Sequence, residues 1–187
     1  ILPQPAPIGL EKRHFELPSM TNTRPFDKIA AGLAFILGLA TILAALGSQF
    51  IGGLQPCQLC LEQRMPYYWG LPLLALVLLL WNRLPLKVWY LGMGLVAALF
   101  AWGTYLGIYH SGVEWGFWPG PTACSGGALG ESISLESLTN LQPIIGCDVV
   151  QFRFLGISLA GYNALVSAAI VVLLLSAMVW QYRRNRT

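Results

Sequence analysis

Four long apolar runs restrict what this sequence can fold into. They span Ile29–Ile51, Met65–Trp81, Val88–Tyr109 and Leu155–Trp180. The first, third and fourth contain no charged residue, and each exceeds the ~20 residues that a helix needs to cross a bilayer. Only 10% of the chain is charged, against about 25% in a typical soluble domain. Because a backbone in lipid must satisfy its own hydrogen bonds, the runs predict transmembrane helices.

The second run is shorter than the others and contains Pro66 and Pro72. It is still predicted to cross the membrane, because a crossing there returns the chain to the side on which the third run begins. The sequence therefore predicts an all-α membrane protein, built as an antiparallel bundle of four transmembrane helices with two loops on one side and both termini on the other.

Basic residues predict the orientation of this bundle. Nine of the eleven Lys and Arg residues flank the runs on one side: Lys12, Arg13, Arg24, Lys28, Arg83, Lys87, Arg183, Arg184 and Arg186. Such an excess marks cytoplasmic flanks, so the N and C termini are predicted to be cytoplasmic. The loops 52–64 and 110–154 are then predicted to face the oxidising periplasm from a bacterial inner membrane. This topology explains the net charge of +3, which gives no reason to expect a nucleic-acid partner.

The predicted domain organisation follows these boundaries. Residues 1–23 are expected to be an N-terminal extension, of which 1–19 are either a cloning remnant or an upstream addition. Residues 24–182 form the membrane domain, and residues 183–187 form a basic cytoplasmic tail. The first apolar run is expected to stay as a helix, because it is long and lacks the small-residue cleavage site of a signal peptide.

All four cysteines fall in the two predicted periplasmic loops. Cys57 and Cys60 form a Cys-x-x-Cys in the first loop, and Cys124 and Cys147 lie 23 positions apart in the second. Pro56 suits the start of a helix, which predicts the Cys-x-x-Cys at a helix N-terminus. Backbone N–H groups at such a position favour a reactive thiolate.

Three interpretations of the four cysteines compete. A structural zinc site would favour two closely spaced pairs, and here one pair is widely separated. Inert structural disulfides do not favour the Cys-x-x-Cys spacing, because its small ring is strained and reducible. A thiol–disulfide relay fits both pairs and needs an electron acceptor. The sequence has no Cys-x-x-Cys-His haem motif and no nucleotide-binding fold, so a quinone dissolved in the bilayer is the favoured acceptor.

Two further side chains are candidates for a cofactor site. Arg64 follows Cys60 by one helical turn, so its cation is placed to stabilise a thiolate or a reduced, anionic cofactor. The alternative is an arginine that reaches to lipid headgroups. His110, at the end of the third run, is interpreted either as a helix C-cap or as a proton carrier beside a redox cofactor.

Other patterns carry structural predictions. Gly103 and Gly107 have the spacing typical of close helix packing. The aromatic residues between Tyr109 and Trp118 are typical of an interfacial belt. Apolar residues within 131–142 predict either a short helix on the membrane surface or a solvated segment with a few buried leucines.

The cysteine motifs in this order resemble the DsbB family, the disulfide bond formation protein B of bacterial inner membranes. The resemblance covers roughly residues 24–182 and is carried by Pro56-Cys57-Gln58-Leu59-Cys60, Arg64, Tyr109-His110, the run from Trp118 to Cys124, Cys147 and Phe154-Leu155-Gly156. It implies a protein-dithiol:quinone oxidoreductase that re-oxidises a periplasmic DsbA-like protein and uses ubiquinone or menaquinone.

The resemblance also implies an order of exchange among the cysteines. Reduced DsbA would attack Cys124, the released Cys147 would attack Cys57, and Cys60 would leave as a thiolate that transfers charge to the quinone. Arg64 would stabilise the quinone contact.

His110 would lie near the same ring. Some family members carry an acidic residue directly before the arginine. Here Gln63 occupies that place, which puts a proton role for an acid in doubt.

Two other functions remain open from the sequence. A vitamin K epoxide reductase-like protein also combines four helices, loop cysteines and a quinone, but its Cys-x-x-Cys follows the loop pair, whereas here it precedes that pair. A non-enzymatic membrane scaffold with structural disulfides would show no turnover with quinone and a reduced dithiol protein.

Overall fold

The computed structural model describes residues 25–121 and 146–186. Its elements are α1 (Pro25–Phe50), α2 (Gln58–Glu62), α3 (Met65–Leu79), α4 (Leu86–Glu114), β1 (Arg153–Phe154), β2 (Ile157–Ser158) and α6 (Leu159–Arg184). Cys124 and the segment 131–142 lie outside the described residues, so the predictions made for them stay predictions.

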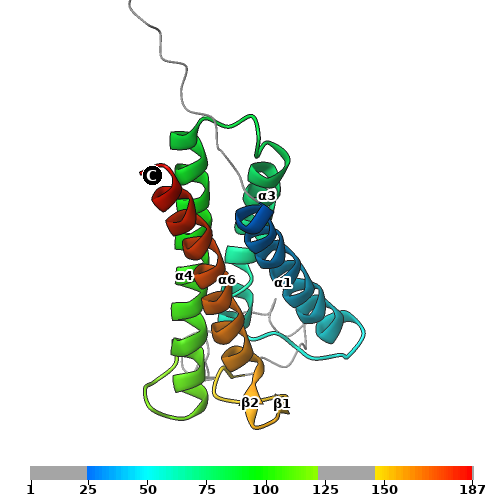
Figure 1. The fold of residues 1–187 in the computed structure, drawn as a ribbon. Coiled ribbons are helices and arrows are strands. Elements are labelled where there is room, and N and C mark those ends of the chain that lie inside the picture. Colours follow the sequence, from blue (N-terminus) through cyan, green and yellow to red (C-terminus); the bar gives the residue numbers. More distant parts are fainter. Residues whose placement is uncertain (1–24, 122–145, 187) are drawn as a thin grey trace, which may run out of the picture.

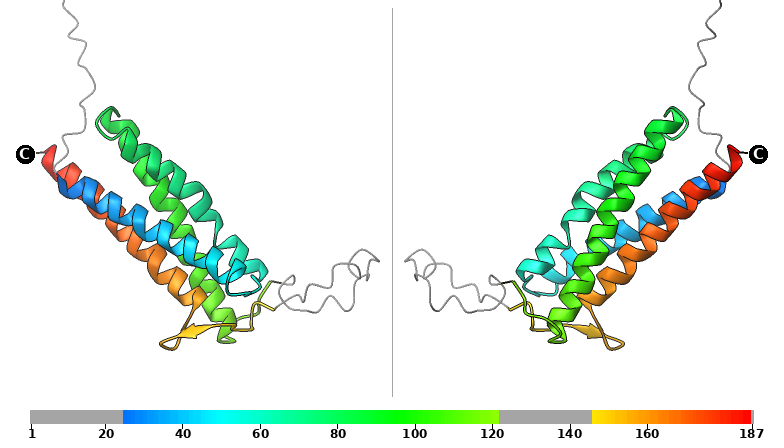
Figure 2. Two further views of the ribbon diagram at one scale, coloured as in Figure 1. Left: turned by 90° about the vertical axis from the view of Figure 1, so that its right-hand side faces the viewer. Right: turned by 90° about the vertical axis from the view of Figure 1, so that its left-hand side faces the viewer.

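The four long helices pack side by side as a bundle (Figure 1). Helix α6 packs against α1 and α4, and α3 packs against α1 and α4. The C-terminal end of α6 and the α3–α4 connection lie at one end of the bundle, and α2 and the strands lie at the other (Figure 2). The Cys-x-x-Cys segment and the hairpin therefore share one end of the bundle.

Helices α1, α4 and α6 are long and apolar enough to cross a membrane. Their outer faces carry exposed large apolar side chains, among them Ile36, Leu43, Leu91, Trp102 and Val172. Helices that are apolar on all faces are typical of membrane spans. The prediction of a mostly helical membrane protein is confirmed by these three helices.

Helix α3 is shorter than the other three. Its 15 residues span about 22 Å, against the ~30 Å of a hydrocarbon core. Pro66 lies in the first turn of α3, where a backbone N–H would have no hydrogen-bond partner within the helix. Pro72 lies in the interior of α3. The helix ends at Leu79, before the predicted end at Trp81, and its crossing of the membrane stays a prediction.

The predicted close packing at Gly103 and Gly107 is confirmed. A Cβ atom on Gly107 would lie 2.7 Å from the backbone nitrogen of Ala164, so only glycine allows α4 to approach α6 this closely. A Cβ atom on Gly103 would lie 3.2 Å from Ser167 Oγ and 3.3 Å from Pro66 Cγ. These contacts hold α4 against both α6 and the start of α3.

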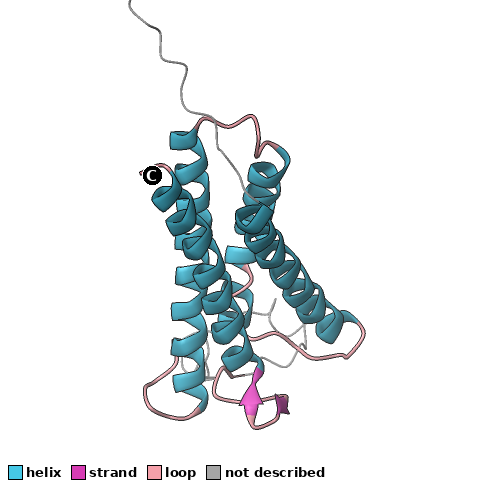
Figure 3. Cartoon of the chain, viewed as in Figure 1, coloured by secondary structure: helices cyan, strands magenta, loops and turns pink. Residues whose placement is uncertain are grey.

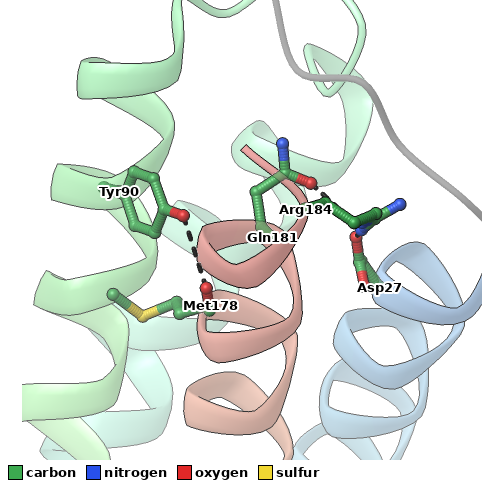
Figure 4. A network of polar contacts seen from close by, with 5 residues as sticks. All are labelled: Asp27, Tyr90, Met178, Gln181 and Arg184. Carbon is green, nitrogen blue, oxygen red and sulfur yellow. Dashed lines mark hydrogen bonds and ion pairs between the residues drawn. The ribbon is translucent and has the colours of Figure 1, made fainter. Parts of the chain in front are cut away.

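The bundle end away from α2 is held by polar contacts (Figure 4). Asp27, in the first turn of α1, is buried and forms an ion pair with Arg184 in the last turn of α6. Arg184 also donates to Gln181 Oε1, and Tyr90 on α4 donates to the carbonyl oxygen of Met178. An acid at a helix start and a cation at a helix end both suit the helix dipole, so the pair joins α1 to α6 favourably.

A short hairpin precedes α6 and was not predicted from the sequence. Strands β1 and β2 are the only strands among the described residues (Figure 3). Leu155 and Gly156 connect them with φ values of 50° and 81°, the positive values that a two-residue hairpin turn of this hand requires. The predicted start of the fourth span at Leu155 is therefore wrong: α6 begins at Leu159, with Ser158 as its N-cap.

Candidate redox site

The Cys-x-x-Cys lies at the start of a helix, as predicted. Cys57 is the N-cap residue of α2, and its Sγ accepts a hydrogen bond of 3.3 Å from the backbone N–H of Cys60. Helix α2 has only five residues before the chain continues into α3. Cys60 therefore lies in the first turn of α2, and its sulfur points back toward Cys57.

The two sulfur atoms of the Cys-x-x-Cys are 2.8 Å apart, and both thiols are free. The pKa of Cys57 is raised because its thiol donates to Cys60 Sγ and because it is buried, while the contact with His110 opposes the rise. The pKa of Cys60 is lowered, chiefly because its sulfur accepts from Cys57; Arg64 lowers it further, and burial and Glu114 oppose this. Cys60 is thus the more readily ionised thiol of the reduced pair, and Cys57 holds its proton more tightly.

This asymmetry predicts a pH dependence of thiol modification. In the reduced protein, iodoacetamide should alkylate Cys60 at pH values below the ordinary thiol pKa of about 8.5, because the thiolate is the reacting form. Cys57 should react only at more alkaline pH. Peptide mass spectrometry across a pH series measures both sites. Cys57→Ala removes the hydrogen-bond donor and should move the Cys60 profile to higher pH, whereas equal profiles in the wild type would contradict the assignment.

His110 lies inside the last part of α4 and faces the Cys-x-x-Cys. Its Nε2 atom is 3.7 Å from Cys57 Sγ, its Nδ1 atom is 2.6 Å from Gln63 Nε2, and only 3% of the residue is exposed. The helix continues through Glu114, and Trp115 is its C-cap. The interpretation of His110 as a helix C-cap is therefore wrong, and the predicted end of this span at Tyr109 is too early.

Arg64 is the N-cap residue of α3 and reaches across to α1. Its Nη1 donates to Gln49 Oε1 at 2.5 Å, and its Nη2 donates to the carbonyl oxygen of Ala45 at 3.4 Å. The guanidinium is partly buried, and its charge lowers the pKa of Cys60. These protein partners hold the cation near the Cys-x-x-Cys.

A cavity of about 520 Å³ lies beside these residues. Cys60, Arg64 and His110 are on its wall, which is otherwise mostly apolar. The remaining wall comes from α1, the segment before Cys57, the start of α3, the hairpin region and the first turns of α6, represented by Ala44, Leu54, Tyr67, Phe154 and Ala160. The predicted cofactor residues and one cysteine therefore share one cavity.

The second loop docks onto the first loop near Cys57. Cys147 is disulfide-bonded and 1% exposed, and it belongs to the same buried cluster as Cys57, Leu59 and Val113. Four residues after Cys147, the Gln151 side chain pairs with the Gln55 backbone: Gln151 Oε1 accepts from Gln55 N at 3.1 Å, and Nε2 donates to Gln55 O at 2.5 Å. This double contact brings the Cys147 segment against the Cys-x-x-Cys segment.

Several site residues were missed by sequence reasoning. Gln49, on α1, accepts from Arg64, and Gln151 pairs with Gln55 from the second loop. Gln63 contacts His110 directly, and Asn163 and Tyr67 continue from Gln63 as a chain of hydrogen bonds. A signal existed for Asn163, because a polar residue inside an apolar run generally faces the interior of a membrane bundle. Gln49 lies in the last turn of the first apolar run and carried the same signal, whereas Gln151 lies in the second loop, where a polar residue carries none.

The comparison with protein families decides the assignment. The family described as "Disulfide bond formation protein DsbB" matches residues 27–177, most of the chain. This chain belongs to the DsbB family. The resemblance seen in the sequence is thereby confirmed, and the protein is a membrane thiol oxidoreductase of the disulfide bond formation machinery.

The chain is also similar to a protein described as "Uncharacterized protein RP370", from Rickettsia prowazekii (strain Madrid E). It is 28% identical over 145 residues, which cover 74% of this chain and 78% of the relative. No solved structure matches the chain significantly. The roles of individual residues therefore depend on the geometry of this site.

Proposed function

We propose that this protein re-oxidises a periplasmic DsbA-like dithiol protein and passes the electrons to a membrane quinone. The observation that carries the proposal is the cavity on whose wall Cys60, Arg64 and His110 lie together. A thiolate, a cation and an imidazole beside an apolar space match a ring that is apolar when oxidised and gains negative charge when reduced.

The cavity suits a quinone ring by its size and by its chemistry. A volume of about 520 Å³ falls within the roughly 300–1,000 Å³ of small-molecule sites. Its wall is mostly apolar, and Arg64 and His110 supply polar atoms that can orient ring oxygens. When bound, a quinone supplies a two-electron acceptor that also takes up two protons. Arg64 would hold it by hydrogen bonding, and Cys60 would stand closest to it among the cysteines.

The proposed electron route begins with the second loop. A thiolate of the reduced partner attacks Cys124 in a disulfide with Cys147, so a mixed disulfide forms and Cys147 leaves as a thiolate. Cys147 then attacks Cys57 of the oxidised Cys-x-x-Cys: the Cys147–Cys57 bond forms, the Cys57–Cys60 bond breaks, and Cys60 leaves as a thiolate. The common buried cluster of Cys57 and Cys147 supports this second exchange. The second thiolate of the partner breaks the mixed disulfide, so the partner leaves as a disulfide and Cys124 is freed. Cys124 attacks Cys147, which re-forms the Cys124–Cys147 bond and releases Cys57, and the dithiol of Cys57 and Cys60 is then oxidised by the quinone.

The lowered pKa of Cys60 supports the same order, because the better leaving group is the thiol with the lower pKa. Cys60 is also the cysteine of the pair that lines the cavity. Leaving as a thiolate therefore places the negative charge, and the two electrons, next to the proposed quinone site.

The proposed placement in the membrane follows from the distribution of charge. The four long helices cross a bacterial inner membrane, with the termini cytoplasmic and with the Cys-x-x-Cys end of the bundle periplasmic. Arg83 and Lys87 flank the α3–α4 connection, and Arg183 and Arg184 end α6, all at the end away from α2. Such clustering of basic residues favours the cytoplasmic side.

Turnover with purified components tests the proposed function. The protein, reconstituted in lipid nanodiscs, is mixed with a reduced DsbA-like dithiol protein and either a ubiquinone or a menaquinone. We expect loss of the quinone absorbance in step with oxidation of the partner, one quinone per dithiol. A non-enzymatic scaffold would bind the partner and consume no quinone. In a Cys147→Ala variant Cys124 is a free thiol, which should attack the disulfide of the oxidised partner: the Cys124–partner bond forms, the partner's own disulfide breaks, and mass spectrometry identifies the mixed disulfide.

A further inference from the structure

A chain of buried and partly buried polar side chains leads from α6 toward the Cys-x-x-Cys. The hydroxyl groups of Ser167 and Tyr67 are 3.1 Å apart, and the Tyr67 hydroxyl donates to Asn163 Oδ1 at 2.7 Å. Asn163 Nδ2 in turn donates to Gln63 Oε1 at 2.7 Å. Each amide therefore uses its oxygen on one neighbour and its nitrogen on the next, which gives the chain a direction.

This direction determines which nitrogen of His110 carries the proton. Gln63 uses its oxygen to accept from Asn163, so its NH₂ group faces His110 Nδ1, at 2.6 Å. An Nδ1 atom that accepts a hydrogen bond has no proton in the neutral imidazole, so the proton is on Nε2. The Nε2 atom is the one that faces Cys57 Sγ, at 3.7 Å.

We propose that Gln63 and Asn163 are positioning residues that hold His110 in the Nε2–H tautomer, with this N–H directed at Cys57 Sγ. The tautomer itself depends only on the hydrogen bonds described above. Its role in turnover rests on the proposed function. Gln63 and Asn163 act through His110 and do not themselves contact a cysteine sulfur in these hydrogen bonds.

The chemistry of the dithiol explains why such an N–H is useful. When the Cys57–Cys60 disulfide re-forms, the two thiols lose two electrons and two protons, and the quinone that accepts both becomes a quinol. Cys60 ionises more readily than Cys57, so Cys57 is the later of the two to lose its proton. As that proton leaves, negative charge develops on Cys57 Sγ, and the His110 N–H can donate to it.

Burial links the orientations of the two amides. Gln63 is 5% exposed, Tyr67 is 2% exposed and Ser167 is fully buried, while Asn163 is partly buried. Turning one amide over alone would leave two facing donors or two facing acceptors away from water. The two amides can therefore turn over only together, and the tautomer of His110 follows from their shared orientation.

The charged and titratable groups around His110 come from three elements. Cys57 and Cys60 face it from the first loop and α2, and Arg64 lies on the same cavity wall at the start of α3. Glu114 lies one turn further along α4 and acts on Cys60 electrostatically. A change of tautomer moves a proton between the two ring nitrogens and leaves the net charge of His110 and of these groups unchanged. The tautomer can therefore be measured at one fixed pH.

Nitrogen NMR of ¹⁵N-histidine-labelled protein measures the tautomer directly. The chain has two histidines, so a His14→Gln background leaves His110 as the single labelled residue. In the reduced protein in nanodiscs, we expect a protonated Nε2 and an unprotonated Nδ1. Gln63→Glu replaces the donor with a group that only accepts, so Nδ1 should become protonated. Gln58→Glu adds the same charge on the exposed side of α2 and should leave the His110 signals unchanged.

Asn163→Asp gives an independent variant of nearly the same shape. It removes the donor to Gln63 Oε1, so the Gln63 amide can turn over and a mixture of the two tautomers should appear. An Nδ1–H tautomer in the wild type would overturn the proposal. Unchanged His110 signals in both Gln63→Glu and Asn163→Asp would also overturn it.

Turnover separates this proposal from the proposed function. Quinone reduction should slow about tenfold in Gln63→Glu and in Asn163→Asp, less than the roughly 10²–10⁴-fold loss of an acid–base group itself, because His110 is still present. Gln63 and Asn163 also line the cavity, so kcat and KM for quinone are measured separately, and a fall in kcat is the effect expected of a positioning role. Asn82→Asp, an exposed change in the α3–α4 connection, should not alter either constant. If the tautomers are as expected but the wild-type protein does not reduce quinone, the proposed function is rejected and the tautomer assignment stands. Normal turnover of both variants would reject the positioning role.

Discussion

Cys60→Ser is expected to abolish quinone reduction, by at least about a thousandfold, while the bundle stays folded. A serine hydroxyl neither ionises near neutral pH nor forms a disulfide, so both the leaving thiolate and the re-formed S–S bond are lost. Cys60 lies outside the main core between the long helices, which limits the cost to stability. The measurement is quinone absorbance with the reduced partner protein, together with thermal unfolding of each variant.

Cys57→Ser should cause the same loss of turnover for a different reason, and this makes the pair of variants informative. In Cys60→Ser, the Cys57 thiolate can attack Cys147, so a Cys57–Cys147 disulfide should accumulate as Cys124 leaves. In Cys57→Ser, that product cannot form. Mass spectrometry of non-reduced peptides distinguishes the two. Full turnover in either variant would remove the Cys-x-x-Cys from the mechanism.

The parts of the fold that the sequence predicts well are those set by one-dimensional signals. The length of an apolar run determines whether a helix can cross a bilayer, and α1, α4 and α6 follow from it. The four-residue spacing of Gly103 and Gly107 is likewise a signal that can be seen in the sequence, and it predicts the close packing of helices found here. Helix ends were less predictable, because α4 gains further turns and α6 starts later where a hairpin replaces the first residues of the predicted span.

The parts that could not be predicted depend on contacts between distant residues. Gln63 and His110 are 47 positions apart, and Asn163 is 100 positions from Gln63, so no local pattern joins them. Cys60 and Arg64 both line the cavity, but α2 ends at Glu62 and Arg64 is the N-cap of α3, so the predicted position of Arg64 one turn along the same helix is wrong. The sequence therefore identifies the reacting groups, whereas the orientation of His110 needs the tertiary structure.

Arg64→Ala is expected to raise KM for quinone about 10- to 100-fold, with a much smaller change in KM for the dithiol partner. The guanidinium is held by Gln49 and by the carbonyl oxygen of Ala45, so it is oriented before a ligand arrives. A hydrogen bond to a charged group contributes about 1.5–3 kcal/mol, which corresponds to this range at about 1.4 kcal/mol per factor of ten. Steady-state kinetics with each substrate varied in turn measures both constants.

Two variants and a pH series separate this role from a contact with lipid headgroups. Arg64→Lys keeps the charge but not the planar set of donors, so it should restore only part of the affinity for quinone. Arg83→Ala, an exposed cation at the other end of the bundle, is the control and should change neither constant. Loss of the Arg64 charge also removes one cause of the lowered pKa of Cys60, so the thiolate should require higher pH in Arg64→Ala. Unchanged dependence on both quinone and pH would assign Arg64 to membrane anchoring, because a cation that neither holds the ring nor stabilises the thiolate has no other part in this chemistry.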